Sequence, residues 1–345
     1  IEPVVTPDEG FRPGGSGAGV PGSVSACPDF VEVYGQERAK RALQICAAGR
    51  HDLSMIGPPG SGKTMLARRM PSILPELGYD EMLEITKIHS IAGEPLPDGI
   101  VSERPFRAPH HSATVQALVG GGSRPKPGEV SLAHMGVLFL DELPEFARHA
   151  IDALRQPLED GFVTISRATS KQRYPSDLIL VTAMNPCPCG YFGHPGRECA
   201  CSEGARQRYF SKVSGPLRDR IDLSIDIGPV EFASLTAPRP TDSLTSAQLR
   251  EGVLRVSRIQ AERYRGEGTR CNAQLSPAQI ERHCAIDAAS ERMLEAAYNK
   301  YGLSARAGNK IRRVARTIAD LDRSENIRAE HLAEAISYRA PSCFA

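Results

Sequence analysis

The chain of 345 residues lacks the features that place a protein in a membrane or on an anionic surface. It has no tryptophan, 6% of its residues are aromatic, and its 42 Lys and Arg are balanced by 41 Asp and Glu, which gives a formal net charge of +1. So small a net charge excludes a global field toward nucleic acid, and any such binding must depend on local patches. No apolar run approaches the roughly 18 residues of a membrane span, and the start, Ile1-Glu2-Pro3, has neither the basic nor the hydrophobic region of a signal peptide. We therefore expect a cytoplasmic protein that has no membrane partner.

The rest of the composition is that of ordinary globular material, with 41% hydrophobic and 24% charged residues. A chain of this length can hold about two compact domains. Residues 10–25 are rich in Gly, Ser and Pro and too poor in large apolar side chains to offset the entropy of ordering, so we expect a linker over residues 1–27. Because the chain does not begin with Met, we expect it to be a fragment of a longer protein.

A glycine-rich loop fits the pattern G-x-x-x-x-G-K-[ST] and lies between an apolar run, residues 52–56, and a segment with helical spacing. Its glycines allow successive backbone N–H groups to point inward at phosphate oxygens, and the start of the helix adds partial positive charge. Lys63 would reach the β- and γ-phosphates of a nucleotide, and the Thr64 hydroxyl would hold Mg²⁺. The predicted nucleotide-binding loop consists of Gly57, Pro58, Pro59, Gly60, Ser61, Gly62, Lys63 and Thr64.

Two further apolar runs end in polar side chains. Residues 136–140 are typical of a strand buried on both faces in a parallel sheet, and Asp141 and Glu142 follow them. We expect Asp141 to hold Mg²⁺ and Glu142 to orient and polarise the attacking water, because phosphoryl transfer depends on positioning and charge compensation. The second run, residues 178–183, leads to Asn185.

Positive charge gathers in a predicted hairpin over residues 161–174 and in a Gly- and Pro-rich stretch over residues 85–133. Structureless loops of this length are uncommon inside a compact domain, so we interpret the stretch as a functional insertion. Its His110 and His111 are disfavoured as metal ligands, because neighbouring side chains of an extended chain point to opposite sides. The predicted nucleic-acid contacts are Arg167, Lys171 and Arg173 on the hairpin and Arg124 and Lys126 in the insertion. A solvated hairpin tip is the alternative.

Four of the nine cysteines form two close pairs, Cys187 with Cys189 and Cys199 with Cys201. Their thiolates could close a tetrahedral Zn²⁺ site around the intervening loop, although C-x-C is tighter than the usual C-x₂-C spacing. His194, within the loop, could replace one thiolate. Free reduced thiols are the alternative, and a disulfide is disfavoured because a phosphate loop indicates a reducing compartment.

From residue 238 onward the sequence changes to helical periodicity. Predicted helices cover residues 244–264, 277–284, 288–298, 304–321 and 329–338. We therefore predict an α/β core over residues 28–237 and an all-helical domain over residues 238–345.

Five segments have the sequences RAPHHS (107–112), PGEVSLAH (127–134), FLDELPEF (139–146), NPCPCG (185–190) and ARTIADL (315–321). Together they closely resemble the magnesium-chelatase-like ComM/YifB family of AAA+ ATPases over about residues 28–340. The resemblance implies an AAA+ P-loop core with a parallel sheet, a helix-2-type insertion and a pre-sensor hairpin, followed by a helical lid. Members of that family have an additional N-terminal Lon-protease-like domain, and residues 1–25 look like the end of the link to it.

The resemblance also assigns roles to single residues. Asn185 matches the polar sensor that positions water against the γ-phosphate, Arg220 matches the arginine finger that completes the site of a neighbouring subunit, and Arg306 matches the lid sensor. Arg218 is an alternative to Arg220, and an ion pair with a neighbouring Asp is the structural alternative.

Two positions depart from the family pattern. Met135 stands where Asn is usual, and Gly308-Asn309-Lys310 replaces a bulkier triplet. Because Gly inside a helix costs about 1 kcal/mol relative to Ala, we expect a looser lid.

In function, the resemblance implies a hexameric ATPase that encircles DNA and drives branch migration during the integration of DNA in natural transformation. Its expected cofactors are ATP, Mg²⁺ and Zn²⁺, and its partners are single-stranded or branched DNA and further copies of the chain. The alternative is a magnesium-chelatase-like motor subunit that remodels a metal-inserting partner, and a third hypothesis is a nucleotide-dependent scaffold. The cysteine cluster and the basic hairpin favour the DNA motor over the chelatase, and Glu142 argues against a scaffold, which needs no water-positioning carboxylate.

Overall fold

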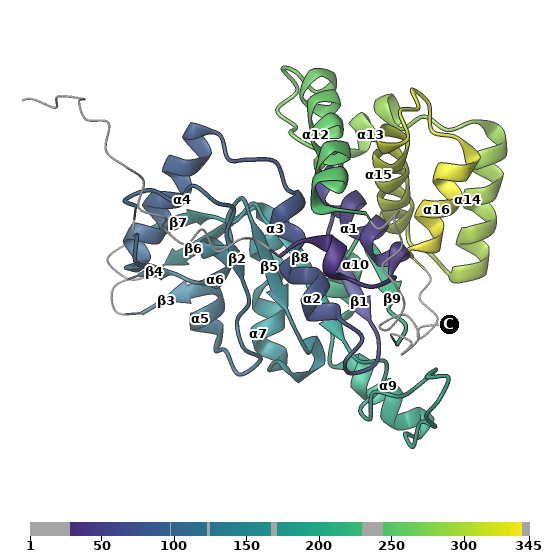
Figure 1. The fold of residues 1–345 in the computed structure, drawn as a ribbon, viewed down its shortest axis with the longest axis horizontal. Helices are drawn as coiled ribbons and strands as arrows, with labels where there is room; N and C mark the ends of the chain where they lie inside the picture. Colours follow the sequence, from purple (N-terminus) through teal and green to yellow (C-terminus); the bar gives the residue numbers. More distant parts are fainter. Residues whose placement is uncertain (1–27, 97, 123–124, 167–170, 230–243, 340–345) are drawn as a thin grey trace, which may run out of the picture.

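A parallel sheet forms the centre of the α/β part of the molecule (Figure 1). The computed structural model describes residues 28–96, 98–122, 125–166, 171–229 and 244–339. Five strands pair in the order β2-β5-β8-β1-β9, and each of these pairings is parallel. Their bounds are Leu53–Ile56 (β1), Phe106–Arg107 (β2), Val137–Leu140 (β5), Ile179–Met184 (β8) and Leu223–Asp226 (β9). The predicted α/β class with a parallel sheet and a C-terminal helical region is confirmed.

The three central strands are buried on both faces, as their continuous apolar sequences predict. Every residue of β1, β5 and β8 is buried. Alternate side chains enter two separate apolar cores: Phe139 and Val181 belong to one core, and Leu138 and Leu180 belong to the other. Since both faces are apolar, polar groups of these strands can reach solvent or a ligand only at the strand ends.

Short helices and two hairpins surround this sheet. The helices are α1 Glu37–Gly49, α2 Lys63–Arg68, α3 Met70–Ile73, α4 Tyr79–Ala92, α5 Val115–Val119, α6 Glu129–Leu132, α7 Arg148–Ala153, α8 Arg155–Asp160, α9 Glu203–Ser211 and α10 Gly215–Arg220. The hairpins pair β3 Gly120–Gly121 with β4 Lys126–Pro127 and β6 Phe162–Ser166 with β7 Lys171–Pro175. Single 3₁₀ turns cover Phe30–Glu32, Leu143–Glu145 and Asn272–Gln274.

The C-terminal region is helical throughout its described part. It contains α12 Ser246–Arg263, α13 Pro277–His283, α14 Ala288–Tyr301, α15 Ala305–Leu321 and α16 Ala329–Ser337. Both α12 and α15 pack against α1, and their apolar side chains belong to the same core as one face of the sheet. The helical region is therefore attached to the α/β part by a continuous apolar contact.

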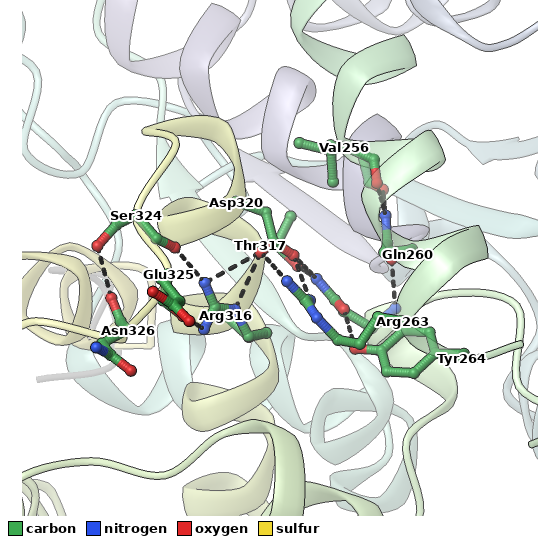
Figure 2. A network of polar contacts seen from close by, with 12 residues as sticks. Val256, Gln260, Arg263, Tyr264, Arg316, Thr317, Asp320, Ser324, Glu325 and Asn326 are labelled. Atoms are coloured by element: carbon green, nitrogen blue, oxygen red, sulfur yellow. Dashed lines mark hydrogen bonds and ion pairs between the residues drawn. The ribbon is translucent and has the colours of Figure 1, made fainter.

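A buried polar network joins α12 and α15 (Figure 2), and one of its residues also bonds to α1. Asp320 accepts hydrogen bonds from the two Nη atoms of Arg263 at 2.6 and 2.8 Å and from Nε of Arg316 at 3.1 Å. Gln260 Nε2 donates to the carbonyl oxygen of Ala48 in α1 at 2.8 Å. The charge-assisted bonds are strong and directional, and they join α12 to α15 inside the helical region. The bond from Gln260 attaches α12 to α1.

The structure shows the surroundings of the two positions that depart from the family pattern, Gly308 and Met135. A Cβ at Gly308 would lie 2.0 Å from the Tyr298 hydroxyl oxygen, so this glycine leaves room for the Tyr298 side chain of α14 against α15. The expectation of a looser lid stays a prediction. Met135 has a φ of 59°, which Asn tolerates better than Met, but its side chain is buried beside Leu77 and Ile85, and that burial offsets the strain.

The range predicted for the insertion, residues 85–133, includes residues that belong to regular elements of the core. Within that stretch α4 continues to Ala92, and β2 is an edge strand of the main sheet beside β5. Pro105 and Pro109 flank the two-residue strand, and they conceal its pattern in the sequence. The rest of this stretch contains α5, α6 and the β3–β4 hairpin, and Leu118 of α5 and Val130 of α6 belong to the same apolar core as Leu138 of β5.

Some expectations fall on residues outside the described ranges. They are the linker over residues 1–27 and the predicted nucleic-acid contacts Arg124 and Arg167.

We expect Gly136→Ala to destabilise the edge of the sheet. A Cβ at Gly136 would lie 2.0 Å from the Pro105 carbonyl oxygen, which accepts the N–H of Val137 at 2.8 Å. The backbone must shift to relieve this overlap, at a cost of about 1–3 kcal/mol in the free energy of unfolding, measured by urea denaturation. Gly78→Ala is the control, because its φ is −72° and a Cβ there would have no atom within 4 Å. Equal stability of the two variants would contradict the prediction.

Candidate functional site

The candidate nucleotide site lies at the edge of the sheet where the strands end, which we call the carboxyl edge; the opposite edge is the amino edge. There β1 leads into the phosphate loop, β5 into Asp141 and Glu142, and β8 into Asn185. Because β8 lies between β1 and β5, the three strand ends are neighbours. The structure thus brings together the predicted residues Lys63, Thr64, Asp141, Glu142 and Asn185.

The phosphate loop needs glycine at three of its positions. Gly60 and Gly62 have φ values of 77° and 87°, in the left-handed region that residues with a side chain rarely adopt. A Cβ at Gly57 would lie 2.3 Å from the carbonyl oxygen of Ile227, directly after β9. The close approach and the curl of the loop therefore both depend on the absence of side chains.

Lys63 is buried, with 8% of the residue exposed. Its Nζ donates to the carbonyl oxygens of Gly57 at 2.7 Å and Pro58 at 2.9 Å and lies 3.4 Å from Asn185 Oδ1. Burial lowers the pKa of Lys63, and the charges of Asp141 and Glu142 act in the opposite direction. A buried ammonium held by neutral oxygens fits an incoming phosphate, which would supply the counter-charge.

Thr64 and Asp141 meet directly in front of this loop. The Thr64 hydroxyl donates to Asp141 Oδ2 at 2.6 Å. Hydroxyl and carboxylate oxygens are the ligands that Mg²⁺ prefers, and Mg²⁺ usually binds through one or two such groups together with phosphates. This pair of oxygens therefore fits a Mg²⁺ ion that accompanies a nucleotide.

A histidine that the sequence did not assign to this site contacts Glu142. His111 Nδ1 lies 3.2 Å from Glu142 Oε2, and Glu142 itself has a φ of 52°. In the sequence these residues are far apart, and only the pairing of β2 with β5 brings them together. From the sequence, His111 was considered only as a metal ligand. In the structure its acidic neighbour is Glu142, the carboxylate that we expect to position the attacking water.

The arginines assigned to nucleotide sensing lie at the amino edge. Arg220 ends α10, and its Nε is 3.1 Å from Oδ2 of Asp52, the residue before β1. The length of β1, about 13 Å, separates Arg220 from the phosphate loop of the same chain. Arg306, in the first turn of α15, lines a cavity of about 300 Å³ together with Arg220. Arg218 is exposed on α10 and is not among the described residues that line this cavity.

The four clustered cysteines converge. The Sγ atoms of Cys187, Cys189, Cys199 and Cys201 all lie within 4.8 Å of one another, and within the described ranges no other group of three or more His, Cys, Asp or Glu is so arranged. The N–H of Tyr191 is the main cause that lowers the pKa of Cys189 to about 6, which favours a thiolate. Such a cluster can bind a metal ion.

His194 is not part of this cluster. Its Nδ1 accepts the backbone N–H of Gly196 at 3.0 Å, and its ring lies edge-on to Tyr191. The structure therefore gives no support to a replacement of one thiolate by His194.

The described basic side chains of the hairpin and the insertion lie on connected elements. Lys171 and Arg173 are exposed on β7, and the Arg173 guanidinium lies 3.3 Å from the ring centroid of Phe162. The Tyr174 hydroxyl donates to the carbonyl oxygen of Pro125 at 2.9 Å, beside Lys126. The β6–β7 and β3–β4 hairpins are therefore in contact.

In the part of the chain that the structure describes, no helix is both long and apolar enough to cross a membrane.

Comparison with known proteins places the chain in a family. The model for magnesium chelatase, subunit ChlI, matches residues 29–235, and the model for the C-terminal part of the same subunit matches residues 243–339. Competence protein ComM of Haemophilus influenzae is 49% identical over 312 residues, which are 90% of this chain and 60% of that protein. The uncharacterized protein YifB of Escherichia coli is 44% identical over the same shares. Magnesium-chelatase subunit ChlI of Olisthodiscus luteus is 26% identical over 170 residues, which are 46% of this chain and 50% of that protein.

The chain spans about 60% of the length of ComM and YifB. The two family models together match the α/β part and the helical region, residues 29–235 and 243–339. The α/β part contains the parallel sheet whose strand ends carry the candidate site. The chain therefore belongs to the magnesium-chelatase-like AAA+ ATPases and, within them, to the ComM/YifB family.

Proposed function

We propose that the chain is the ATPase part of a hexameric DNA motor, a helicase that drives branch migration when DNA is integrated during natural transformation or recombination. The observation that carries the ATPase activity is the convergence of Lys63, the Thr64–Asp141 pair and Glu142 at the carboxyl edge. The connection to DNA uptake rests on the relative named as a competence protein.

In the proposed reaction the chain supplies charge and position. Lys63 leaves its carbonyl partners and binds the β- and γ-phosphates, while Thr64 and Asp141 hold Mg²⁺, which neutralises developing phosphate charge when bound. Glu142 orients and polarises the attacking water. Asn185, 3.4 Å from Lys63 Nζ, holds that water against the γ-phosphate.

Two substitutions should separate binding from hydrolysis. Lys63→Ala should weaken ATP binding roughly 10- to 100-fold, because a charged hydrogen-bond donor is lost. Glu142→Gln should keep ATP binding and lower kcat about 100-fold or more, because the amide cannot polarise water. Equilibrium binding of a fluorescent ATP analogue and steady-state phosphate release measure the two effects. Hydrolysis by Glu142→Gln at the parent rate would refute the role of this carboxylate.

The proposed active site is completed between subunits. Arg220 and Arg306 share one cavity at the amino edge, away from the phosphate loop of their own chain. A planar and permanently charged guanidinium suits the charge that develops on the γ-phosphate. The ion pair of Arg220 with Asp52 engages Nε, and 40% of the Arg220 side chain is exposed. We therefore assign both arginines to the nucleotide of the neighbouring copy.

Mixed oligomers test this assignment. Arg220→Ala and Lys63→Ala should each be nearly inactive alone, whereas a 1:1 mixture should regain activity at about a quarter of its interfaces, where an intact loop meets an intact arginine. Arg220→Ala mixed with the double variant Lys63→Ala/Arg220→Ala is the matched control, because no interface there is complete. Absence of recovery at every mixing ratio would exclude a shared site that uses Arg220.

DNA contact is assigned to the connected hairpins. Lys171, Arg173 and Lys126 are exposed in the structure, and Arg124 and Arg167 belong to the same two segments of the sequence. A ring of six copies would bring even two such charges per subunit to about a dozen around one channel. Symmetry can thus concentrate positive charge that a net charge of +1 does not reveal.

We expect Lys171→Ala combined with Arg173→Ala to weaken DNA binding by roughly tenfold and to flatten its salt dependence, because phosphate contacts release counterions. Arg292→Ala combined with Lys300→Ala removes the same charge from exposed positions on α14 and is the control. Fluorescence anisotropy with single-stranded and branched DNA at several salt concentrations provides the measurement. Equal affinity of both double variants would remove the hairpin from the proposal.

The alternative function is that of a magnesium-chelatase-like motor subunit, which the family model and the ChlI relative favour. The ATPase rate with and without DNA distinguishes the two functions. Stimulation by branched or single-stranded DNA supports the DNA motor. Indifference to DNA together with stimulation by a porphyrin-binding partner supports the alternative.

We assign a structural Zn²⁺ to Cys187, Cys189, Cys199 and Cys201. The cluster begins two residues after Asn185 and ends before α10, which carries Arg220. A metal would therefore restrain the segment between two nucleotide-sensing positions. Its loss should lower stability and turnover without removing a catalytic group.

Elemental analysis tests the zinc assignment. Protein purified without chelators should contain about one zinc per chain, and Cys199→Ser/Cys201→Ser should lose it. Cys284→Ala is the control, since Cys284 is buried outside the cluster and its loss should lower stability while the metal stays. A fully active parent protein without metal would overturn the assignment.

A further inference from the structure

Arg220 is held at two points in the structure. Its guanidinium Nε faces Asp52 Oδ2 at 3.1 Å, and its main-chain carbonyl oxygen accepts a hydrogen bond from Nζ of Lys310. Arg220 is the last residue of α10, where carbonyl groups lack a partner within the helix. Lys310 therefore caps the end of the helix that presents the arginine.

Lys310 belongs to the helical region, not to the sheet. It lies in α15 one turn after Arg306, and its side chain is 12% exposed. Besides the carbonyl of Arg220, its Nζ contacts Asp222 Oδ1 at 2.9 Å. The other oxygen of Asp222 accepts the N–H of Asp52 at 3.1 Å. One ammonium thus joins α15 to the last residue of α10 and to Asp222, and Asp222 in turn contacts the residue before β1.

The charges in this cluster support an ionised pair. Burial lowers the pKa of Lys310, and Asp222 opposes that effect. Although burial acts to raise it, the pKa of Asp222 is held well below its usual value, mainly by Lys310 and then by His51. Removal of the ammonium would leave a buried carboxylate without its main partner, so the geometry of the cluster depends on Lys310.

The same helix sets the position of the second arginine. Arg306, Lys310 and Arg313 follow one another at helical spacing, and all three line the cavity that Arg220 enters. Gly308 lies between them on the same helix and leaves room for the Tyr298 side chain of α14. A movement of the helical region must therefore move Arg306 and the support of Arg220 together.

We infer that Lys310 is a positioning residue that couples the helical region to Arg220, so that both arginines act on the neighbouring nucleotide as one unit. This inference rests on the proposed shared site.

Lys310→Met should lower kcat roughly 10- to 100-fold, the range expected for a misplaced charge, while ATP affinity changes less than about twofold. Lys310→Arg, which can still pair with Asp222 and donate to the carbonyl, should restore most of the rate. Lys300→Met, on the exposed face of α14, is the control.

Mixed oligomers distinguish positioning from a folding defect. Lys310→Met subunits mixed with Lys63→Ala subunits should regain activity to the same extent as Arg220→Ala subunits do, because the neighbour supplies an intact Lys310 and Arg220. If Lys310→Met unfolds at a lower temperature, Lys310→Met/Asp222→Asn replaces it, since this variant leaves no unpaired buried carboxylate; the same loss of kcat and recovery are expected. An unchanged kcat, or a loss that is not restored where that of Arg220→Ala is, overturns the inference and leaves the shared site standing. Failure of Arg220→Ala itself to recover overturns both.

Discussion

The parallel pairing of β5, β8 and β1 is the constraint on which the rest of the structure depends. Strands that run the same way end at the same edge, and both faces of these strands are buried in apolar cores. The charged groups next to these three strands therefore gather at the two edges of the sheet. The carboxyl edge holds Lys63, Thr64 and Asp141, and the amino edge holds the ion cluster around Asp52.

The amino edge is held together by backbone as much as by charge. The carbonyl oxygen of Asp52 accepts the N–H groups of Asp222 and Leu223, each at 3.0 Å, and Asp52 Oδ1 accepts the N–H of Leu180 at 2.9 Å. One residue before β1 thereby aligns the starts of β8 and β9 with β1. Its other carboxylate oxygen faces Arg220. Buried carboxylates need several donors to offset desolvation, so the site of Arg220 is defined by the same bonds that set the strand register.

Much of this arrangement could be predicted from the sequence, and the reasons for the failures are physical. The phosphate loop has a sequence pattern of its own, β5 and β8 are largely apolar runs followed by polar residues, and the edge at which they end follows from parallel pairing. Strand β2 could not be recognised in the sequence, because two residues between prolines show no periodicity. Without β2 beside β5, the contact of His111 with Glu142 could not be predicted either. The ion pair of Arg220 with Asp52 could not be predicted, because 168 residues of chain separate the two and only the sheet order joins them.

The position of the helical region decides how the two edges can work together. α12 and α15 pack on α1, and Gln260 of α12 also bonds to the backbone of α1. In this position Arg306 lines a cavity with Arg220 at the amino edge. The length of β1, about 13 Å, separates this edge from the phosphate loop of the same chain. The two edges therefore differ in charge: one holds a buried ammonium beside a hydroxyl–carboxylate pair, and the other carries the guanidinium groups of Arg220 and Arg306. Copies that stack edge to edge around a ring would bring unlike halves together at every interface, which is the heterologous contact that cyclic symmetry requires.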